Sequence, residues 1–192
     1  MHLTIRQRIL GSYALIMAIM LIMVGVVYVH LRAVGRETTK VEEFSLAEFR
    51  SVIDSSLIST FLLSRLVVPQ MHGRGYGRIL NIASTMAHVS LPMRTAYSSA
   101  KSALLGFTRA LALEVASEGI TVNAICPGPF ETDMNVAIIN NPEANRQFLA
   151  SLPVGRWGKL PEIGALTCFL CSETAGFITG TDILIDGGWT AK

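Results

Sequence analysis

Helix and strand patterns alternate from Phe44 to the end of this sequence, and this alternation restricts the folds that the chain can adopt. Three apolar runs have the length of strands: Arg78–Ala83, Ile120–Ile125 and Asp182–Asp186. The runs are almost continuously apolar instead of alternating with polar residues, which is typical of strands covered on both faces. We therefore predict an α/β fold, with a parallel sheet of three strands between flanking helices.

Helical segments separate the predicted strands. Ser45 and Glu48 form a capping box at the start of a helix that runs to about Met71. The glycine-rich stretch 73–77 ends that helix. Further helices are predicted at about 96–117, ended by a glycine, and at about 161–172.

A separate hydrophobic segment, Ile9–Leu31, precedes this region and contains no Asp, Glu, Lys or Arg. As a helix its 23 residues reach about 35 Å, enough to cross a hydrocarbon core of about 30 Å. A signal peptide has a shorter apolar stretch followed by small residues, and a buried globular helix usually has a polar stripe. We predict a membrane-spanning helix, whose orientation stays open because basic residues flank both ends.

The first sixteen residues, MHLTIRQRILGSYALI, resemble the start of methyl-accepting chemotaxis proteins and related bacterial sensors. In that family this segment is the first membrane helix, with a cytoplasmic N-terminus and an extracytoplasmic helical bundle after it. No such bundle follows here, because the chain changes character near Glu43. We therefore divide the chain into residues 1–43, a transmembrane-type helix with a linker, and residues 44–192.

Composition excludes some classes of function. The net charge of +2 comes from scattered single charges without a basic stripe, so we predict no nucleic-acid partner. Three cysteines are too few for a disulfide scaffold and fit a reducing compartment. Cys168 and Cys171 form a C-x-x-C that could be a redox or metal pair. We favour two small buried hydrophobic residues on a helix, and predict no metal site.

Three polar residues follow a pattern that suggests acid–base chemistry. Ser84 follows the first predicted strand, and Tyr97 and Lys101 lie four residues apart on the next helix. Residues at this spacing share one face of a helix. A neighbouring ammonium favours the phenolate, so we expect Lys101 to lower the pKa of Tyr97 from its usual value of about 10.

The stretch from about Phe44 to the C-terminus resembles the short-chain dehydrogenase/reductase family. The resemblance is carried by NIAS, AYSSAKSAL, VNAICPGPFET and GTDILIDGG, which occur in the family's order and spacing. Among relatives, the chain looks most like gluconate 5-dehydrogenases or 3-oxoacyl-carrier-protein reductases. This resemblance implies the C-terminal half of a Rossmann-like doubly wound sheet, with the three strands as the family's fifth to seventh.

The resemblance also implies a role for each matching residue. Tyr97 would be the general acid/base, Ser84 would hydrogen-bond the substrate oxygen, and Lys101 would hold the nicotinamide ribose of NAD or NADP. The loop against the nicotinamide would comprise Pro127, Gly128, Phe130 and Thr132. Without that resemblance, Pro-Gly is a common end to a strand and Thr132 could cap the following helix.

The sequence departs from the family in two places. Ser56 stands where the family's catalytic tetrad has Asn, and its shorter side chain puts the proton relay in doubt. The family's T-G-x-x-x-G-x-G turn, whose backbone holds the pyrophosphate, is not found in the sequence. We therefore expect impaired hydride transfer, and a sheet edge left unpaired where the family's fourth strand lies.

Three hypotheses follow. The first is an NAD(P)-dependent oxidoreductase acting on a small alcohol or carbonyl, in a family whose members are cytoplasmic. The second is a non-catalytic interaction module, anchored in the membrane by residues 9–31 and forming homo-oligomers through its two long helices. The third is a truncated or fused reading frame.

Overall fold

The computed structural model describes residues 40–191 of the chain. The predicted membrane helix Ile9–Leu31 and the segment that resembles chemotaxis proteins lie outside the described residues. The predicted boundary after residue 43 lies close to the first described residue and stays a prediction.

The sheet has the predicted three parallel strands, in the order β1-β2-β3. Their bounds are Gly77–Ile82 for β1, Ile120–Pro127 for β2 and Asp182–Ile185 for β3. Strand β2 lies in the centre and is buried along nearly its whole length, which explains its continuous apolar sequence. Its fully buried Asn123 donates to Ile178 O at 2.7 Å and accepts from Thr181 N at 3.2 Å, so both ends of the amide are satisfied.

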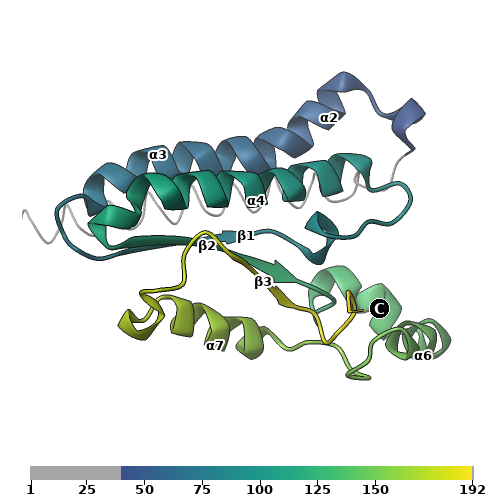
Figure 1. Ribbon diagram of the computed structural model, residues 1–192. Coiled ribbons are helices and arrows are strands. Elements are labelled where there is room, and N and C mark those ends of the chain that lie inside the picture. The colour runs from purple at the N-terminus through teal and green to yellow at the C-terminus, as the bar shows by residue number, and fades with distance from the viewer. Residues whose placement is uncertain (1–39, 192) are drawn as a thin grey trace, which may run out of the picture.

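One long helical layer covers the face of the sheet shown uppermost in Figure 1. It contains α2 (Leu46–Ile53), α3 (Ser59–Met71) and α4 (Thr95–Val115). The predicted capping box is confirmed, since Ser45 Oγ accepts from Glu48 N at 3.2 Å and Glu48 Oε2 accepts from Ser45 N at 3.0 Å. Helix α4 packs against β2 through a core that includes Leu111, Val115 and Ile120.

The helix predicted to run without interruption to Met71 contains a π-helical turn at Asp54–Ile58. Hydroxyl groups in this region bond back to helix carbonyls: Ser59 Oγ donates to Ser55 O at 2.7 Å and Thr60 Oγ1 donates to Ser56 O at 2.8 Å. Such bonds compete with the backbone hydrogen bonds of an α-helix and favour a local departure from α-helical geometry. Periodicity alone did not reveal this turn, because the hydrophobic pattern does not record these hydroxyl bonds.

By length and composition, the helix Leu46–Met71 could cross a membrane. The core helices of soluble proteins pass the same test, and this helix packs against α4 through Val52 and its neighbours. It is therefore weak evidence for a membrane span, and it is not the segment in which we predicted one.

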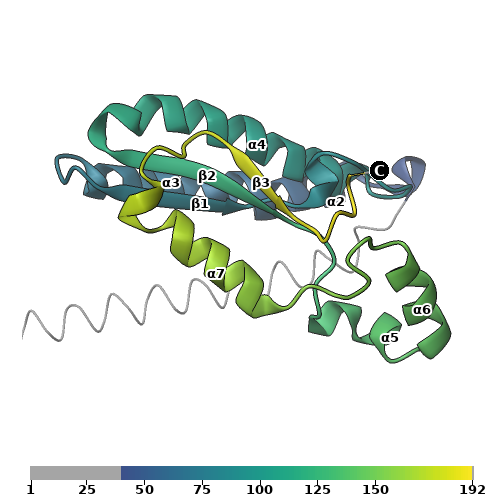
Figure 2. The same cartoon turned by 60° about the horizontal axis from the view of Figure 1, so that its bottom comes forward.

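The opposite face of the sheet carries α7 (Leu160–Leu170), so helices flank both faces as predicted (Figure 2). The short helices α5 (Val136–Ile139) and α6 (Pro142–Ala150) lie beyond the carboxyl ends of the strands (Figure 2). The expectation for the C-x-x-C of α7 was wrong: Cys168 is exposed and Cys171 half-buried.

The amino end of the sheet is closed by one side chain. The Arg78 guanidinium donates to the carbonyl oxygens of Gly77 at 2.8 Å, Gly119 at 3.2 Å and Ser172 at 3.2 Å. Gly119 itself adopts a left-handed conformation with φ of 73°, which ends the helical segment after α4 as predicted. In the described part of the chain, no strand pairs with the other edge of β1.

Candidate active site

The first predicted site residue, Ser84, lies directly after β1 at the carboxyl end of the sheet. It is only 7% exposed, and its Oγ accepts a hydrogen bond from Met86 N at 3.1 Å. This bond caps the 3₁₀ turn Thr85–Ala87 and fixes the serine side chain. Because that oxygen accepts from the backbone, its own hydrogen can be donated to another group.

Tyr97 and Lys101 share one face of α4, as their spacing predicts. The ammonium nitrogen of Lys101 lies 5.7 Å from the centroid of the Tyr97 ring. Lys101 is 6% exposed, and its Nζ donates to Ile82 O, in the last residue of β1, at 3.0 Å. This bond ties the cation to the strand that leads into Ser84.

A cavity of about 350 Å³ joins these elements. Ser84 and Tyr97 both line it, together with Pro127 and Gly128 from the end of β2. The structure therefore brings four of the predicted site residues together, with Lys101 buried behind the tyrosine. The remaining walls are mainly apolar and comprise Thr85, Met86, Leu91, Arg94, Pro129, Met134, Asn135, Ile138, Phe148 and Trp189.

Gly128 is required where β2 leaves the sheet, because its backbone passes directly beside β3. A Cβ atom at this position would lie 2.5 Å from Asp186 Cβ and 2.7 Å from Asp186 Cα. The Gly128 N–H donates to Ile185 O at 3.0 Å and holds the two segments together.

Asp186 stabilises the chain segment after β3. Its carboxylate accepts from Gly188 N at 2.9 Å, from Thr190 N at 2.9 Å and from Thr190 Oγ1 at 2.6 Å. Burial opposes ionisation of this carboxyl, but the bonds from Thr190 and Gly188 outweigh it and hold its pKa below the usual value. The ionised Asp186 thereby positions Trp189 at the cavity.

Two predicted loop residues lie outside the cavity. Phe130 is 6% exposed, forms a β-bridge with Gly158 and packs its ring against that glycine. Thr132 Oγ1 lies 3.5 Å from Asn135 Nδ2 and does not cap the following turn. Both residues shape the loop after Gly128 and do not face the cavity.

Ser56, the residue at the position of the family's Asn, lies in the π-helical turn. Its side chain is 5% exposed, and its hydroxyl has no hydrogen-bond partner among the described residues. It does not line the cavity that contains Ser84 and Tyr97.

Sequence reasoning missed Arg94 and Trp189 at the cavity. Arg94 is the N-cap residue of α4 and the one charged residue that lines the cavity in the described part of the chain. Its position three residues before Tyr97 places it on the same helix face, so the spacing could have identified it. Trp189 could have been suspected because the carboxyl ends of parallel strands meet at one edge of a sheet.

Comparisons with known proteins find relatives that match most of the chain. A family model described as enoyl-(acyl carrier protein) reductase matches residues 26–190, a match that begins inside the predicted membrane helix. Nodulation protein G of Azospirillum brasilense is 42% identical over 142 residues, which are 74% of this chain and 57% of that protein. The D-beta-hydroxybutyrate dehydrogenase of Rhizobium meliloti (strain 1021) is 35% identical over 163 residues, which are 80% of this chain and 63% of that protein.

Two solved dehydrogenase structures have a fold similar to that of this chain. The structure of 4-hydroxyisoleucine dehydrogenase complexed with NADH superposes with a TM-score of 0.78 at 36% identity, covering 82% of this chain and 65% of that one. A candidate 2-deoxy-D-gluconate 3-dehydrogenase from Agrobacterium tumefaciens, with bound NADP, superposes with a TM-score of 0.76 at 33% identity. The match covers 81% of this chain and 63% of that one. The chain thus spans 57% and 63% of the length of the two curated relatives above.

Proposed function

This chain belongs to the short-chain dehydrogenase/reductase family, and from that premise we propose that it serves NAD(P)-dependent hydride transfer between an alcohol and a carbonyl. One observation carries the proposal. Ser84 and Tyr97 come from different elements and line the same cavity, while Lys101 is buried beside the tyrosine ring. Relatives of known structure bind NADH or NADP.

In alcohol oxidation, the phenolate oxygen of Tyr97 would take the proton of the substrate hydroxyl. Ser84 would donate its hydroxyl hydrogen to the same substrate oxygen, since its Oγ already accepts from Met86 N. The Lys101 cation would favour the phenolate over the neutral phenol. In carbonyl reduction the same groups would return the proton. The nicotinamide, when bound, supplies or accepts the hydride at the substrate carbon.

The residues at the carboxyl end of the sheet fit the nicotinamide end of such a cofactor. Pro127 and Gly128 provide a close backbone approach at the cavity, and Lys101 provides a cation beside Tyr97. Phe130 and Thr132 would support this loop through Gly158 and Asn135 without contacting the ring.

We also propose that nucleotide binding by these 192 residues is weak. The sequence contains no T-G-x-x-x-G-x-G turn, whose backbone amides hold a pyrophosphate in this fold. Binding would then depend on the nicotinamide end alone. The unpartnered hydroxyl of Ser56 would further weaken a relay that the family builds around Asn.

The cavity favours a small substrate that carries a carboxylate. Most of its walls are apolar, and Arg94 lies three residues before Tyr97. A guanidinium binds a carboxylate in a planar, bidentate geometry, which would orient the reacting carbon toward Tyr97. The relative named D-beta-hydroxybutyrate dehydrogenase bears the name of a hydroxy acid. We therefore propose hydroxy and oxo acids as the substrate class.

Titration calorimetry with NADH and NADPH on the full chain tests this function. We expect weak binding of at least one nucleotide that saturates only at high nucleotide concentration. Replacement of the general acid, Tyr97→Phe, should leave that binding intact and lower the rate of hydroxy-acid oxidation by about 10²–10⁴-fold. The absence of saturable binding would reject oxidoreductase activity for this chain and leave the family assignment unchanged.

A second candidate function is self-association through the long helices, with the predicted segment 9–31 as a membrane anchor. An apolar groove of about 310 Å³ lies between α3 and α4, and Leu62, Leu63 and Leu66 of α3 are 49%, 43% and 68% exposed. Leucines exposed in such number are typical of an interface.

Two experiments test this candidate function. Light scattering in detergent should show a dimer or larger species that Leu66→Glu dissociates, and membrane fractions should retain the chain after carbonate extraction. An intact mass equal to that of all 192 residues in native cells would count against a fused or truncated reading frame.

A further inference from the structure

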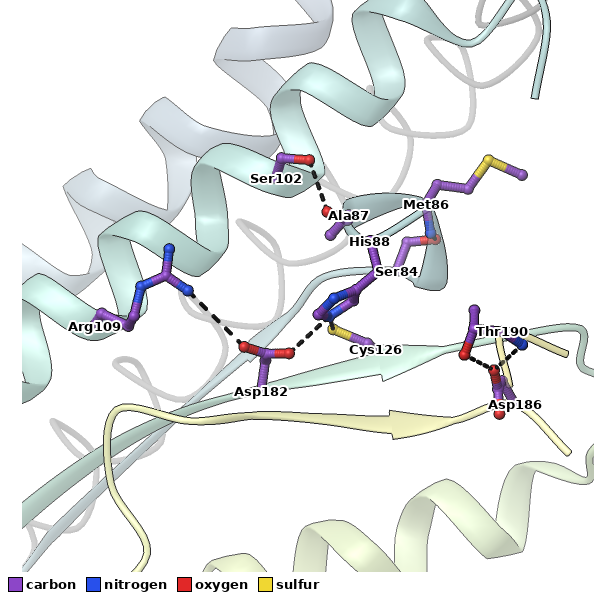
Figure 3. A network of polar contacts seen from close by, with 10 residues as sticks. All are labelled: Ser84, Met86, Ala87, His88, Ser102, Arg109, Cys126, Asp182, Asp186 and Thr190. Atoms are coloured by element: carbon purple, nitrogen blue, oxygen red, sulfur yellow. Dashed lines mark hydrogen bonds and ion pairs between the residues drawn. The ribbon is translucent and has the colours of Figure 1, made fainter. Parts of the chain in front are cut away.

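Three side chains with metal-binding atoms meet on the α4 side of the sheet, separate from the cavity of the proposed active site. His88 follows the turn after β1, Cys126 lies in β2, and Asp182 begins β3 (Figure 3). His88 Nε2 lies 2.7 Å from Asp182 Oδ2 and 3.9 Å from Cys126 Sγ. All three ligand atoms lie within 4.8 Å of one another.

The fold fixes the position of each group. Ala124 pairs with Asp182 in the parallel register, so Cys126 and Asp182 point to the same face of adjacent strands. The backbone around His88 is held by two bonds: Ser102 Oγ donates to Ala87 O at 3.0 Å, and His88 N donates to Thr85 O at 3.0 Å. The three groups therefore meet without rearrangement of the main chain.

The arrangement of these three side chains fits a metal site better than a catalytic triad with a cysteine nucleophile. In a triad, the acid binds one ring nitrogen of the histidine and the nucleophile binds the other. Here Asp182 and Cys126 both approach the same nitrogen, Nε2 of His88. A cation between the three groups accounts for this convergence. We propose that His88, Cys126 and Asp182 bind a Zn²⁺ ion.

The donor set suits zinc. Imidazole nitrogen, thiolate sulfur and carboxylate oxygen are the ligands that Zn²⁺ takes in proteins, with a water in the fourth position of an open site. In a tetrahedral site with ordinary bond lengths the ligand atoms are about 3.3–3.6 Å apart. The distances of 2.7 and 3.9 Å from His88 Nε2 lie on either side of this range, and all three ligand atoms lie within 4.8 Å of one another, so side-chain adjustments of about 1 Å close the site.

The surroundings supply an entry path and a supporting group. The side chains of His88 and Asp182 are 33% and 22% exposed, whereas Cys126 is fully buried behind them. An ion can therefore enter from the solvent side and reach the thiol last. Arg109 NH1 lies 4.0 Å from Asp182 Oδ1, the oxygen that does not face His88 (Figure 3). Such an outer contact orients a ligating carboxylate.

Binding must release one proton. Zinc takes the thiolate, so the Cys126 S–H proton passes to solvent, and the imidazole binds through Nε2 with its N–H on Nδ1. Burial and the Asp182 charge raise the pKa of the Cys126 thiol to about 11, despite the Ser84 backbone hydrogen bond and the Lys101 charge, which lower it.

Cobalt gives a readout that does not depend on enzyme activity. The full chain, reduced and free of metal, is titrated with Co²⁺ while the near-ultraviolet sulfur-to-cobalt charge-transfer band is recorded. Zn²⁺ is then added to displace the cobalt. We expect one Co²⁺ per chain with a thiolate band, and stoichiometric displacement by Zn²⁺.

Substitutions at the three positions show which side chains bind the metal. Cys126→Ser should abolish the band, and His88→Gln or Asp182→Asn should weaken cobalt binding by at least about 100-fold. His88→Gln keeps the test valid if the buried cysteine variant does not fold, because this side chain is partly exposed. His72→Gln is the matched control, since His72 Nδ1 lies 2.6 Å from Glu118 Oε2 in a similar pair with no cysteine.

Substitution of the other two cysteines tests whether the metal binds at Cys126 or at the C-x-x-C. Cys168→Ser combined with Cys171→Ser should leave both band and affinity unchanged. Loss of the band in that double variant would move the metal to the C-x-x-C of α7 and overturn the proposal. So would a wild-type chain without a band, a band that survives Cys126→Ser, or an affinity that His88→Gln leaves unaltered.

Discussion

Replacement of Gly128 by alanine tests how closely the end of β2 and the start of the segment after β3 approach each other. The new Cβ would lie 2.5 Å from Asp186 Cβ, whereas non-bonded carbon atoms prefer about 3.5–4.0 Å. The two segments must then separate by about 1 Å. That movement lengthens the 3.0 Å hydrogen bond from Gly128 N to Ile185 O beyond the range of a good bond.

The expected cost is the sum of two effects. Overpacking costs about 1–3 kcal/mol and loss of the hydrogen bond about 0.5–1.5 kcal/mol, so Gly128→Ala should destabilise the fold by about 1.5–4.5 kcal/mol. For a chain of this size each kcal/mol lowers the Tm by about 2–4 °C, so the Tm should fall by roughly 3–18 °C. Thermal unfolding followed by circular dichroism measures this shift.

Gly106→Ala is the matched control. Gly106 lies within α4, and nothing approaches the position of its Cβ within 4 Å. Alanine is preferred over glycine inside a helix by about 0.5–1 kcal/mol, so this variant should unfold at the same or a higher temperature than the wild type. An equal Tm for Gly128→Ala and the wild type, or an equal loss in both variants, would refute the close-approach argument.

Three further predictions concern other contacts. Asn123→Ala should lower the free energy of unfolding by about 1–3 kcal/mol in urea titrations, because it removes the two hydrogen bonds of a fully buried amide; full stability would contradict this. In the metal-free chain, the free energy of unfolding should fall as the pH rises from 9 to about 11, because an unfolded thiol ionises first while folded Cys126 keeps its proton; Cys126→Ala should remove this part of the decline. Hydrogen bonds from Arg156 and from Lys159 N lower the pKa of Glu162 to about 2, so its carboxyl should titrate there by NMR and nearer its usual value in Arg156→Ala.

Much of the fold could be predicted because each element has a local signal. The continuous apolar run at Ile120 predicted the buried central strand, and the Ser45–Glu48 pair predicted a helix start to the residue. The π-helical turn at Asp54–Ile58 has no such signal, since it depends on hydroxyl bonds that the hydrophobic pattern does not record. The exposure of Cys168 was mispredicted because the apolar composition of α7 does not show which side of the helix faces the sheet.

The candidate active site and the proposed zinc site were only partly predictable from the sequence, for a related reason. Tyr97 and Lys101 lie one helical turn apart, so their shared face follows from spacing alone. The meeting of His88 with Cys126 and Asp182 depends on strand register and on the loop after β1, and these residues lie far apart in the sequence. Register of this kind is set by the whole sheet and cannot be read from any one segment.

The contacts of Arg78 have a consequence for how this protein can vary. Its partners at the amino end of the sheet are the carbonyl oxygens of Gly77, Gly119 and Ser172, which belong to the main chain. Every amino acid carries such an oxygen, so a mutation of Ser172 leaves its acceptor in place, whereas Gly77 and Gly119 are restricted by the lack of space for a Cβ atom. Arginine itself has no equivalent, because an ammonium group presents no planar fork to three separated acceptors. Homologues should therefore keep this arginine and the two glycines, while the residue at position 172 varies.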